Sequence, residues 1–215
     1  MLIVERIVCG VLDVNAYVVH REGEQACFVV DPAASEPVLA YMDAQNLYCT
    51  HILLTHGHFD HIGGTADIKA QTGATICIHE NDADMLHDDT RSLAVMANLH
   101  IKPSTADHTF AQDELFIAAG IRVQVLHTPG HTPGGVCYVC LDDSILFSGD
   151  TLFRMSVGRA DFPGASNEQL YASIIEKLFA LPKEYAIYPG HMRSTTLDFE
   201  RVRNPVTRLY RGNQW

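Results

Sequence analysis

Short apolar runs bounded by Gly, Pro, Asp or Asn recur along the whole chain, a pattern typical of β-strands. The runs at 14–19 and 27–31 flank a polar turn at 21–24, so they are read as two strands joined by that turn. We expect strands over residues 1–6, 14–19, 27–31, 51–54 and 75–78, and a second block over 115–117, 123–126, 136–141 and 144–147.

Three segments have the composition or apolar spacing of helices. Residues 36–45 form the first, with Pro37 suited to its opening turn. The second is expected over 62–72, although Gly63 and Gly64 make its start tight, and the third over 169–179, where apolar residues recur at helical spacing. Two strand-rich halves, each with helices, indicate an α/β protein.

The segment 80–112 is the least regular part of the chain. We interpret it as a helical insertion beside the mouth of a site, with an apolar underside that includes Met85 and Leu93. Substrate contact by this segment is left open. Its acidic residues are expected to form a solvated face rather than a metal site of their own. They are Asp82, Asp84, Asp88 and Asp89.

Length and composition indicate one globular unit. The chain has 215 residues, of which 47% are hydrophobic, enough for the core of one large domain. It has no repeat with a period of about 20–50 residues and no low-complexity linker. We therefore expect residues 1–215 to form a single domain.

The net charge and the hydropathy of the chain limit the kinds of molecule that it is expected to bind. Fifteen Lys and Arg against 26 Asp and Glu give a net charge of −11, which argues against nonspecific nucleic-acid binding, because that requires a basic surface. The N-terminus lacks a signal-peptide pattern, and no run of about eighteen apolar residues could span a membrane. We expect a cytoplasmic protein that acts on a small molecule, and its oligomeric state is left open.

The six cysteines lie mostly in apolar runs, where Cys behaves as a small buried hydrophobic residue. Together with the missing signal, this favours free thiols in a reducing compartment. Cys137 and Cys140 form a C-x-x-C pair, but residues three apart in a strand point to opposite faces. A redox or zinc role for this pair is therefore not expected.

The main candidate for chemistry follows the apolar run 52–54. His56, His58, Asp60 and His61 lie within six residues, and imidazole with carboxylate is a metal-ligand set. These side chains are too crowded for one tetrahedral ion. We therefore expect two ions, one held by His56 and His58, the other by Asp60 and His61.

Further ligands come from three later segments, each an apolar strand-like run followed by a turn. His131, Asp150 and His191 stand in these segments beside Gly or Pro, which allow tight turns and close backbone approach. Rigid strands that end in ligand-bearing loops hold metal sites well. The other histidines carry weaker signals. Structural roles are favoured for His20, His51 and His127, although a role of His127 around the site stays open. His79 is ambiguous.

The combined H-x-H-x-D-H, His, G-D-T and P-G-H motifs resemble the metallo-β-lactamase superfamily. The segments 149–153, 158–159, 181–183 and 188–191 are similar to those of glyoxalase II-like (hydroxyacylglutathione) hydrolases, and 195–205 resembles their short bacterial branch. The resemblance implies a four-layer αββα sandwich. Longer glyoxalase II enzymes add a helical C-terminal domain. The chain stops at Trp215, and Met192-Arg193 departs from the family pattern, so weak glutathione recognition is expected.

The resemblance also implies a mechanism. Asp150 would bridge two divalent ions, with zinc the first choice and iron or manganese also suited. Hydroxide held by the metals, with Asp60 beside it, would attack a thioester such as S-lactoylglutathione. Arg159 would hold a substrate carboxylate or the loop, and a structural salt bridge is an equal alternative. The ligand set would be His56, His58 and His131 for one ion and Asp60, His61 and His191 for the other.

Other functions remain as alternatives. A persulfide (sulfur) dioxygenase shares the loop but uses one iron held by two histidines and one aspartate. A metallo-hydrolase of another ester or thioester fits equally well. A β-lactamase is disfavoured because a carboxylate at Asp150 is not typical of those enzymes, and a non-catalytic binding module is disfavoured because no ligand is lost.

Overall fold

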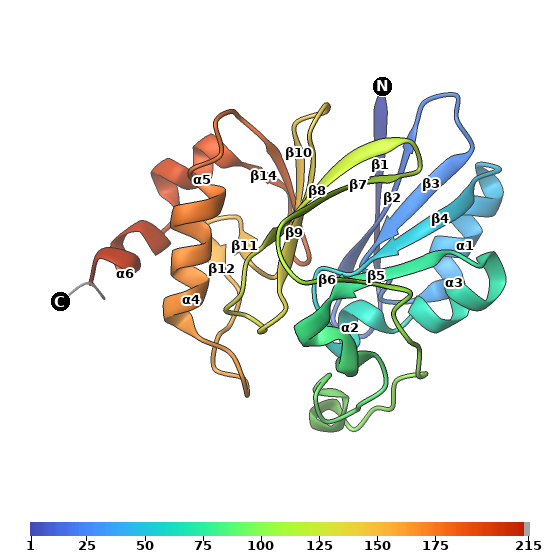
Figure 1. The fold of residues 1–215 in the computed structure, drawn as a ribbon, viewed down its shortest axis with the longest axis horizontal. Helices are drawn as coiled ribbons and strands as arrows, with labels where there is room; N and C mark the ends of the chain where they lie inside the picture. Colours follow the sequence, from blue (N-terminus) through green and yellow to red (C-terminus); the bar gives the residue numbers. More distant parts are fainter. Residues whose placement is uncertain (213–215) are drawn as a thin grey trace.

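The computed structural model describes residues 1–212, and its centre is a pair of mixed sheets packed face to face (Figure 1). The first sheet has the spatial order β1 (Leu2–Cys9), β2 (Val14–Arg21), β3 (Ala26–Val30), β4 (Tyr48–Leu53), β5 (Thr75–His79) and β6 (His108–Phe110). The second has the order β14 (Thr195–Thr196), β13 (Ala186–Pro189), β10 (Ile145–Gly149), β9 (Val136–Cys140), β8 (Ile121–His127) and β7 (Glu114–Ala118). A small hairpin pairs β11 (Leu152–Phe153) with β12 (Ser156–Val157).

Helices cover the outer face of each sheet (Figure 1). On the first sheet these are α1 (Ser35–Ala44), α2 (Phe59–Ile62) and α3 (Thr65–Thr72). On the second they are α4 (Asn167–Ala172), its π-helical continuation η3 (Ser173–Leu178), α5 (Leu197–Arg203) and α6 (Val206–Gly212). Among residues 1–212, no helix combines the length and apolar character needed to cross a membrane.

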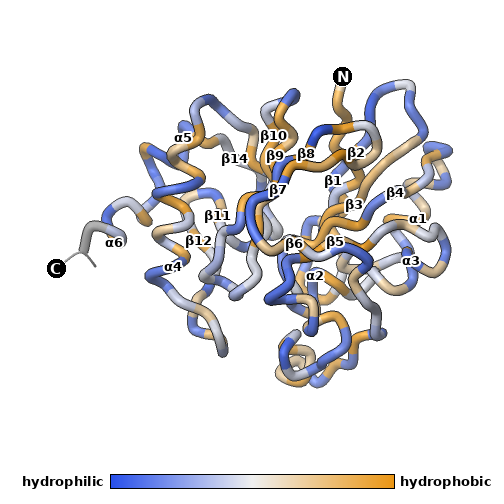
Figure 2. Tube along the Cα trace, viewed as in Figure 1, coloured by the Kyte–Doolittle hydropathy of each residue, from blue (hydrophilic) through white to orange (hydrophobic). Residues whose placement is uncertain are grey.

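Three apolar layers hold this arrangement together. Alternate residues of one strand enter different layers, because side chains in a strand point to opposite faces. In β2, Val18 packs beneath α1 with Val38, whereas Val19 packs between the sheets with Val123. The third layer lies under α4 and α5, and Figure 2 shows hydrophobic stretches along the central strands. The expected four-layer αββα sandwich is confirmed.

The C-x-x-C pair behaves as the alternation predicts. Cys137 enters the layer under α4, and Cys140 enters the layer between the sheets. Both thiols are free and fully buried, and the other four cysteines are also free and buried. Burial raises the pKa of Cys137 to about 11, so this thiol is protonated and unreactive at neutral pH.

Two predicted helices differ from the structure in detail. The helix expected over 62–72 begins only at Thr65, as α3, because Gly63 and Gly64 separate it from α2, which ends at Ile62. The cause is close packing: the Gly64 amide donates to the Pro32 carbonyl at 2.7 Å, and a Cβ on Gly64 would lie 2.6 Å from the Ala34 carbonyl carbon. The helix expected over 169–179 begins as α4 and widens into η3.

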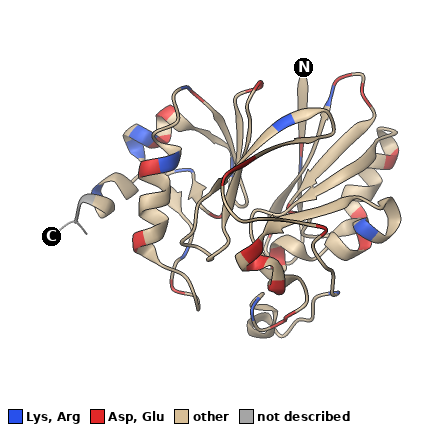
Figure 3. Cartoon of the chain, in the orientation of Figure 1, with Lys and Arg blue, Asp and Glu red and all other residues tan. Residues whose placement is uncertain are grey.

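The segment 80–112 is only partly helical. It forms two 3-10 helices, η1 (Glu80–Leu86) and η2 (Ala94–Ala97), and then adds the unpredicted strand β6 beside β5. The expected solvated acidic face is correct for Asp84 but wrong for Asp82, which is fully buried. Elsewhere the acidic positions are spread mainly over helices and loops (Figure 3).

Candidate metal centre

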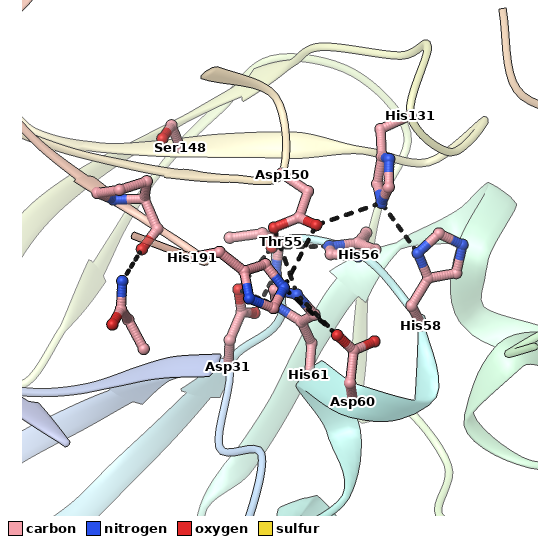
Figure 4. A network of polar contacts seen from close by, with 12 residues as sticks. Asp31, Thr55, His56, His58, Asp60, His61, His131, Ser148, Asp150 and His191 are labelled. Atoms are coloured by element: carbon pink, nitrogen blue, oxygen red, sulfur yellow. Dashed lines mark hydrogen bonds and ion pairs between the residues drawn. The ribbon is translucent and has the colours of Figure 1, made fainter. Parts of the chain in front are cut away.

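The seven predicted ligands lie close together where strands of both sheets end (Figure 4). Four of them follow β4, in the loop before α2 and on α2 itself, and the other three follow β8, β10 and β13. The chain backbone also approaches closely here: a Cβ on Gly190 would lie 2.4 Å from Asp150 Oδ1. In chain order the ligands are His56, His58, Asp60, His61, His131, Asp150 and His191.

Six of these side chains form two groups, and Asp31 forms a third group with His56 and His61 that overlaps both. Ligand-type atoms of the first group lie within 4.8 Å of one another, and the same holds for the second. These groups pair the residues as the sequence predicted. The first group is His56, His58 and His131, and the second is Asp60, His61 and His191.

Asp150 lies between the two groups. Its Oδ1 is 3.4 Å from His61 Nε2, in the second group. Its Oδ2 is 3.6 Å from Nε2 of His131, in the first group, and 3.6 Å from Nε2 of His191. One carboxylate therefore presents oxygens to both groups, which is the arrangement needed to bridge two cations.

Hydrogen bonds fix which nitrogen of three imidazoles carries the proton. His56 Nδ1 lies 3.0 Å from the Thr55 hydroxyl, His61 Nδ1 lies 3.0 Å from Asp31 Oδ2, and His131 Nδ1 lies 2.6 Å from the Arg159 carbonyl. The carboxylate and the carbonyl can only accept, and Thr55 already donates to Asp31, so Nδ1 donates in each pair. The Nε2 lone pairs of these imidazoles are thus available for a cation.

Asp31 was missed in the sequence and lies behind the ligands. It is 1% exposed and follows β3, where it accepts from the Thr55 amide at 2.7 Å and the Thr55 hydroxyl at 2.6 Å. It also orients His61. A carboxylate directly after the apolar run 27–30 is the sequence signal that could have identified it.

The residues fit a pair of divalent metal ions. His56 Nε2, His61 Nε2 and Asp150 Oδ1 are buried and have no hydrogen-bond partner within the described structure. Leaving buried polar atoms unsatisfied is costly, and a bound cation would satisfy all three. The donor set of imidazoles and carboxylates suits zinc, iron or manganese.

Electrostatics favour the metal-binding form of most of these ligand atoms. Burial, reinforced by neighbouring imidazoles, lowers the pKa of His56 and lowers that of His58 to about 3, so both are neutral. Burial alone would raise the pKa of Asp60 and Asp150, but the adjacent His61 outweighs it and the pKa of each is lowered. Both carboxylates are therefore ionised. Burial alone would lower the pKa of His61 and His191, but the adjacent carboxylates outweigh it and raise the pKa of both, so a cation would compete with a proton at these two imidazoles.

Asp82, from η1, joins two of the ligand-bearing loops. Its Oδ2 accepts from the Thr132 hydroxyl at 2.6 Å and from the Gly57 amide at 3.3 Å, and its Oδ1 accepts from the Gly134 amide at 2.7 Å. Gly57 lies between His56 and His58, and Thr132 follows His131. Burial raises the pKa of Asp82 despite these donors. Its place in an irregular acidic segment gave no signal of this role.

Arg159 contributes to the centre through its backbone. Its carbonyl accepts from His131, whereas its exposed guanidinium makes two hydrogen bonds to Asp161, at 2.9 and 2.8 Å. The guanidinium also lies over the Phe162 ring, 4.4 Å from its centre. The structural salt bridge considered for Arg159 is present; substrate binding stays a prediction.

A cavity of about 540 Å³ opens above the ligands. Asp60, Asp150 and His191 form part of its floor. Its walls are mainly apolar and include Leu93 and Met96 from the segment 80–112. This segment therefore lies beside the mouth of the site, as expected. The volume is typical of a small-molecule site.

The remaining histidines lie outside the two groups. His79 stacks on His127 with ring centres 4.0 Å apart, and Nε2 of His127 lies 3.0 Å from the Pro133 carbonyl. His20 Nδ1 lies 3.2 Å from the Arg21 carbonyl, and His51 Nδ1 lies 2.9 Å from the Thr50 hydroxyl. These contacts fit the structural roles favoured for His20, His51 and His127, and they give the ambiguous His79 a stacking partner outside the two groups.

Comparison with known proteins agrees with this geometry. The family model of the metallo-beta-lactamase superfamily matches residues 9–191. The chain is 31% identical over 202 residues to a probable metallo-hydrolase, YqgX, of Bacillus subtilis, covering 93% of this chain and 95% of that one. It is 37% identical over 175 residues to a hydroxyacylglutathione hydrolase of Rhodospirillum rubrum, covering 81% of this chain but 60% of that protein.

Two solved structures share the fold over nearly the whole chain. The BLEG-1 B3 metallo-beta-lactamase has a TM-score of 0.90 at 31% identity, covering 95% of this chain and 98% of that one. TTHA1623 in a di-iron-bound form has a TM-score of 0.82 at 35% identity, covering 94% and 98%. The chain therefore belongs to the metallo-beta-lactamase superfamily, as a short member related to hydroxyacylglutathione hydrolases.

Proposed function

We propose that the protein is a binuclear metal-dependent hydrolase that cleaves a thioester, such as S-lactoylglutathione, or a related ester. The observation that carries this proposal is the position of Asp150, whose carboxylate lies between the two donor groups and is close to imidazoles of both. When bound, two divalent ions supply Lewis acidity to the scissile carbonyl and lower the pKa of water. The named relatives support hydrolysis, and the di-iron form of TTHA1623 supports a binuclear centre.

Each residue has a definite part in this proposal. His56, His58 and His131 would hold one ion, Asp60, His61 and His191 would hold the other, and Asp150 would contact both. Zinc is our first choice, and iron and manganese suit the same donors. Asp60 lines the cavity as an ionised carboxylate, so it can orient the attacking water by accepting a hydrogen bond. A thiolate leaves readily, so no strong general acid is required.

Metal analysis combined with substrate assays tests the proposal. We expect about two equivalents of metal per chain and thioester hydrolysis without oxygen uptake. One equivalent of iron with oxygen consumption on a persulfide would contradict it in favour of the dioxygenase. A β-lactam belongs in the panel because BLEG-1 is a B3 metallo-beta-lactamase. Cleavage of the β-lactam alone would also overturn the proposal.

A further inference from the structure

The walls of the cavity differ sharply from its floor. The floor carries the imidazoles and carboxylates of the centre, whereas the walls are formed mainly by apolar side chains from three separate parts of the chain. Leu93 and Met96 come from the segment 80–112, Phe153 and Val157 from the β11–β12 hairpin, and Phe162 from the loop that follows.

The apolar character continues to the rim, where large side chains are left in solvent. Met96 is 72% exposed, Met192 is 58% exposed and Leu12 is 53% exposed, and all three line the cavity. Contiguous exposed apolar surface around a pocket is typical of a binding site. Methionine is flexible and polarisable, so it adapts to apolar ligands of different shape.

Positive charge at the cavity is scarce. Within residues 1–212, Arg159 is the one Lys or Arg in the lining, and Asp161 already pairs with its guanidinium. Arg6 lies outside the lining and donates to the Met192 carbonyl at 3.4 Å. Glutathione carries two carboxylates, and recognition of carboxylates normally uses Arg, Lys or free backbone amides. The net charge of −11 also disfavours an anionic ligand.

We propose that the cavity selects a substrate that carries an apolar chain or ring beside the scissile bond, and that it makes little use of glutathione. This inference rests on the proposed hydrolase function, because it assigns the apolar walls to the substrate of the same centre. Apolar area buried against the walls supplies the affinity, at about 25 cal/mol per Å².

Binding of thioethers tests this separately from hydrolysis, because thioethers are not cleaved. Calorimetry on the metal-loaded and metal-free protein would compare S-hexylglutathione, S-methylglutathione and S-hexyl-N-acetylcysteamine. We expect the hexyl group to raise affinity by at least about tenfold over methyl. We expect replacement of glutathione by N-acetylcysteamine to change affinity by less than about threefold. Equal affinity of the two glutathione ligands, or loss of binding without glutathione, would overturn the inference.

A pair of neighbouring variants locates the binding surface. Met96 lines the cavity, and Met96→Gln keeps the length of its side chain. The adjacent Val95 is 53% exposed but does not line the cavity, so Val95→Gln is the matched control. We expect Met96→Gln to weaken binding of the hexyl ligands by about threefold or more and Val95→Gln to leave it unchanged. Equal effects of the two variants would contradict the assignment. Absence of hydrolysis on every thioester would instead refute the proposed function and leave these binding results intact.

Discussion

At the scale of single residues, the centre depends on the groups behind the ligands as much as on the ligands. Asp31, Thr55 and the Arg159 carbonyl each fix the tautomer of one imidazole and aim its Nε2. Partners of this kind maintain metal affinity, because they orient the ring and raise the basicity of the ligand nitrogen.

Asp60→Ala is expected to remove one of the two metal ions and leave the fold intact. Asp60 is assigned to the second donor group, and its ion pairs with His61 and His191 lie within that group. Metal analysis should therefore fall from about two equivalents to one, with a far-ultraviolet spectrum like that of the native protein. Asp84→Ala, an exposed Asp of η1, is the control and should retain both ions. Two retained equivalents with full activity in Asp60→Ala would exclude the assignment.

Asp82→Asn tests the connection between the two loops. All three partners of Asp82 are donors, so an amide NH₂ would face one of them and leave it unsatisfied. We expect a loss of about 1–3 kcal/mol in the free energy of unfolding, measured in urea. Metal titration should show weaker binding at the group formed by His56, His58 and His131.

The matched control for that change is Asp84→Asn. Asp84 lies two residues away on the same 3-10 helix, but its carboxylate is exposed and pairs with Arg91. This variant should bind metal like the native protein and change stability by less than about 0.5 kcal/mol. If Asp82→Asn titrates with metal identically to Asp84→Asn, Asp82 has a structural role alone.

At the scale of elements, the position of α2 depends on a tight junction. Gly63 and Gly64 separate α2, which carries two ligands, from α3, and both glycines contact the chain at 32–35. A helix continuing without this break would direct Asp60 and His61 along a different axis from the rest of the centre.

Gly64→Ala is therefore expected to impair both stability and metal binding. Alanine suits φ −91 at this residue, but its Cβ would lie 2.6 Å from the Ser35 nitrogen, so the backbone must shift. We expect a loss of about 1–3 kcal/mol in unfolding free energy and weaker metal binding. Gly23→Ala is the contrasting variant: it is strained by φ +81 but lies at the opposite end of β3 from Asp31. Normal metal affinity in Gly64→Ala would show that the junction does not position α2.

At the scale of the whole molecule, the centre connects the two sheets. Four ligands follow β4 of the first sheet, and three follow strands of the second. Ions held in common by both sheets would stabilise their packing, because a ligand that binds only the folded state raises stability by mass action.

Removal of metal should therefore lower the melting temperature of the entire protein. Treatment with a strong chelator, followed by calorimetry, is expected to lower Tm by about 5 °C or more in one cooperative transition. The chelated protein reloaded with about two equivalents of metal is the control and should recover the native Tm. An identical Tm after complete metal loss, verified by metal analysis, would show that the ions do not join the sheets.

Several features of the fold and centre could be predicted from the sequence alone. The strands were predictable because short apolar runs such as 14–19 and 136–141 reflect burial on both faces. The grouping of His56 with His58, and of Asp60 with His61, followed from their short spacing. The αββα arrangement came from the resemblance of the motifs, because periodicity indicates only the mixture of α and β.

Features that depend on contacts between distant segments were decided only by the tertiary structure. Burial of Asp82 requires the loops at 57 and 132–134, and the role of Asp31 requires His61 thirty residues later. The break at Gly64 likewise reflects the backbone at 32–35. Local propensity carries no information about such partners, because each contact exists only after the chain has brought both segments to one place. For the same reason the apolar walls above the centre, drawn from three separate segments, appear only in the folded protein.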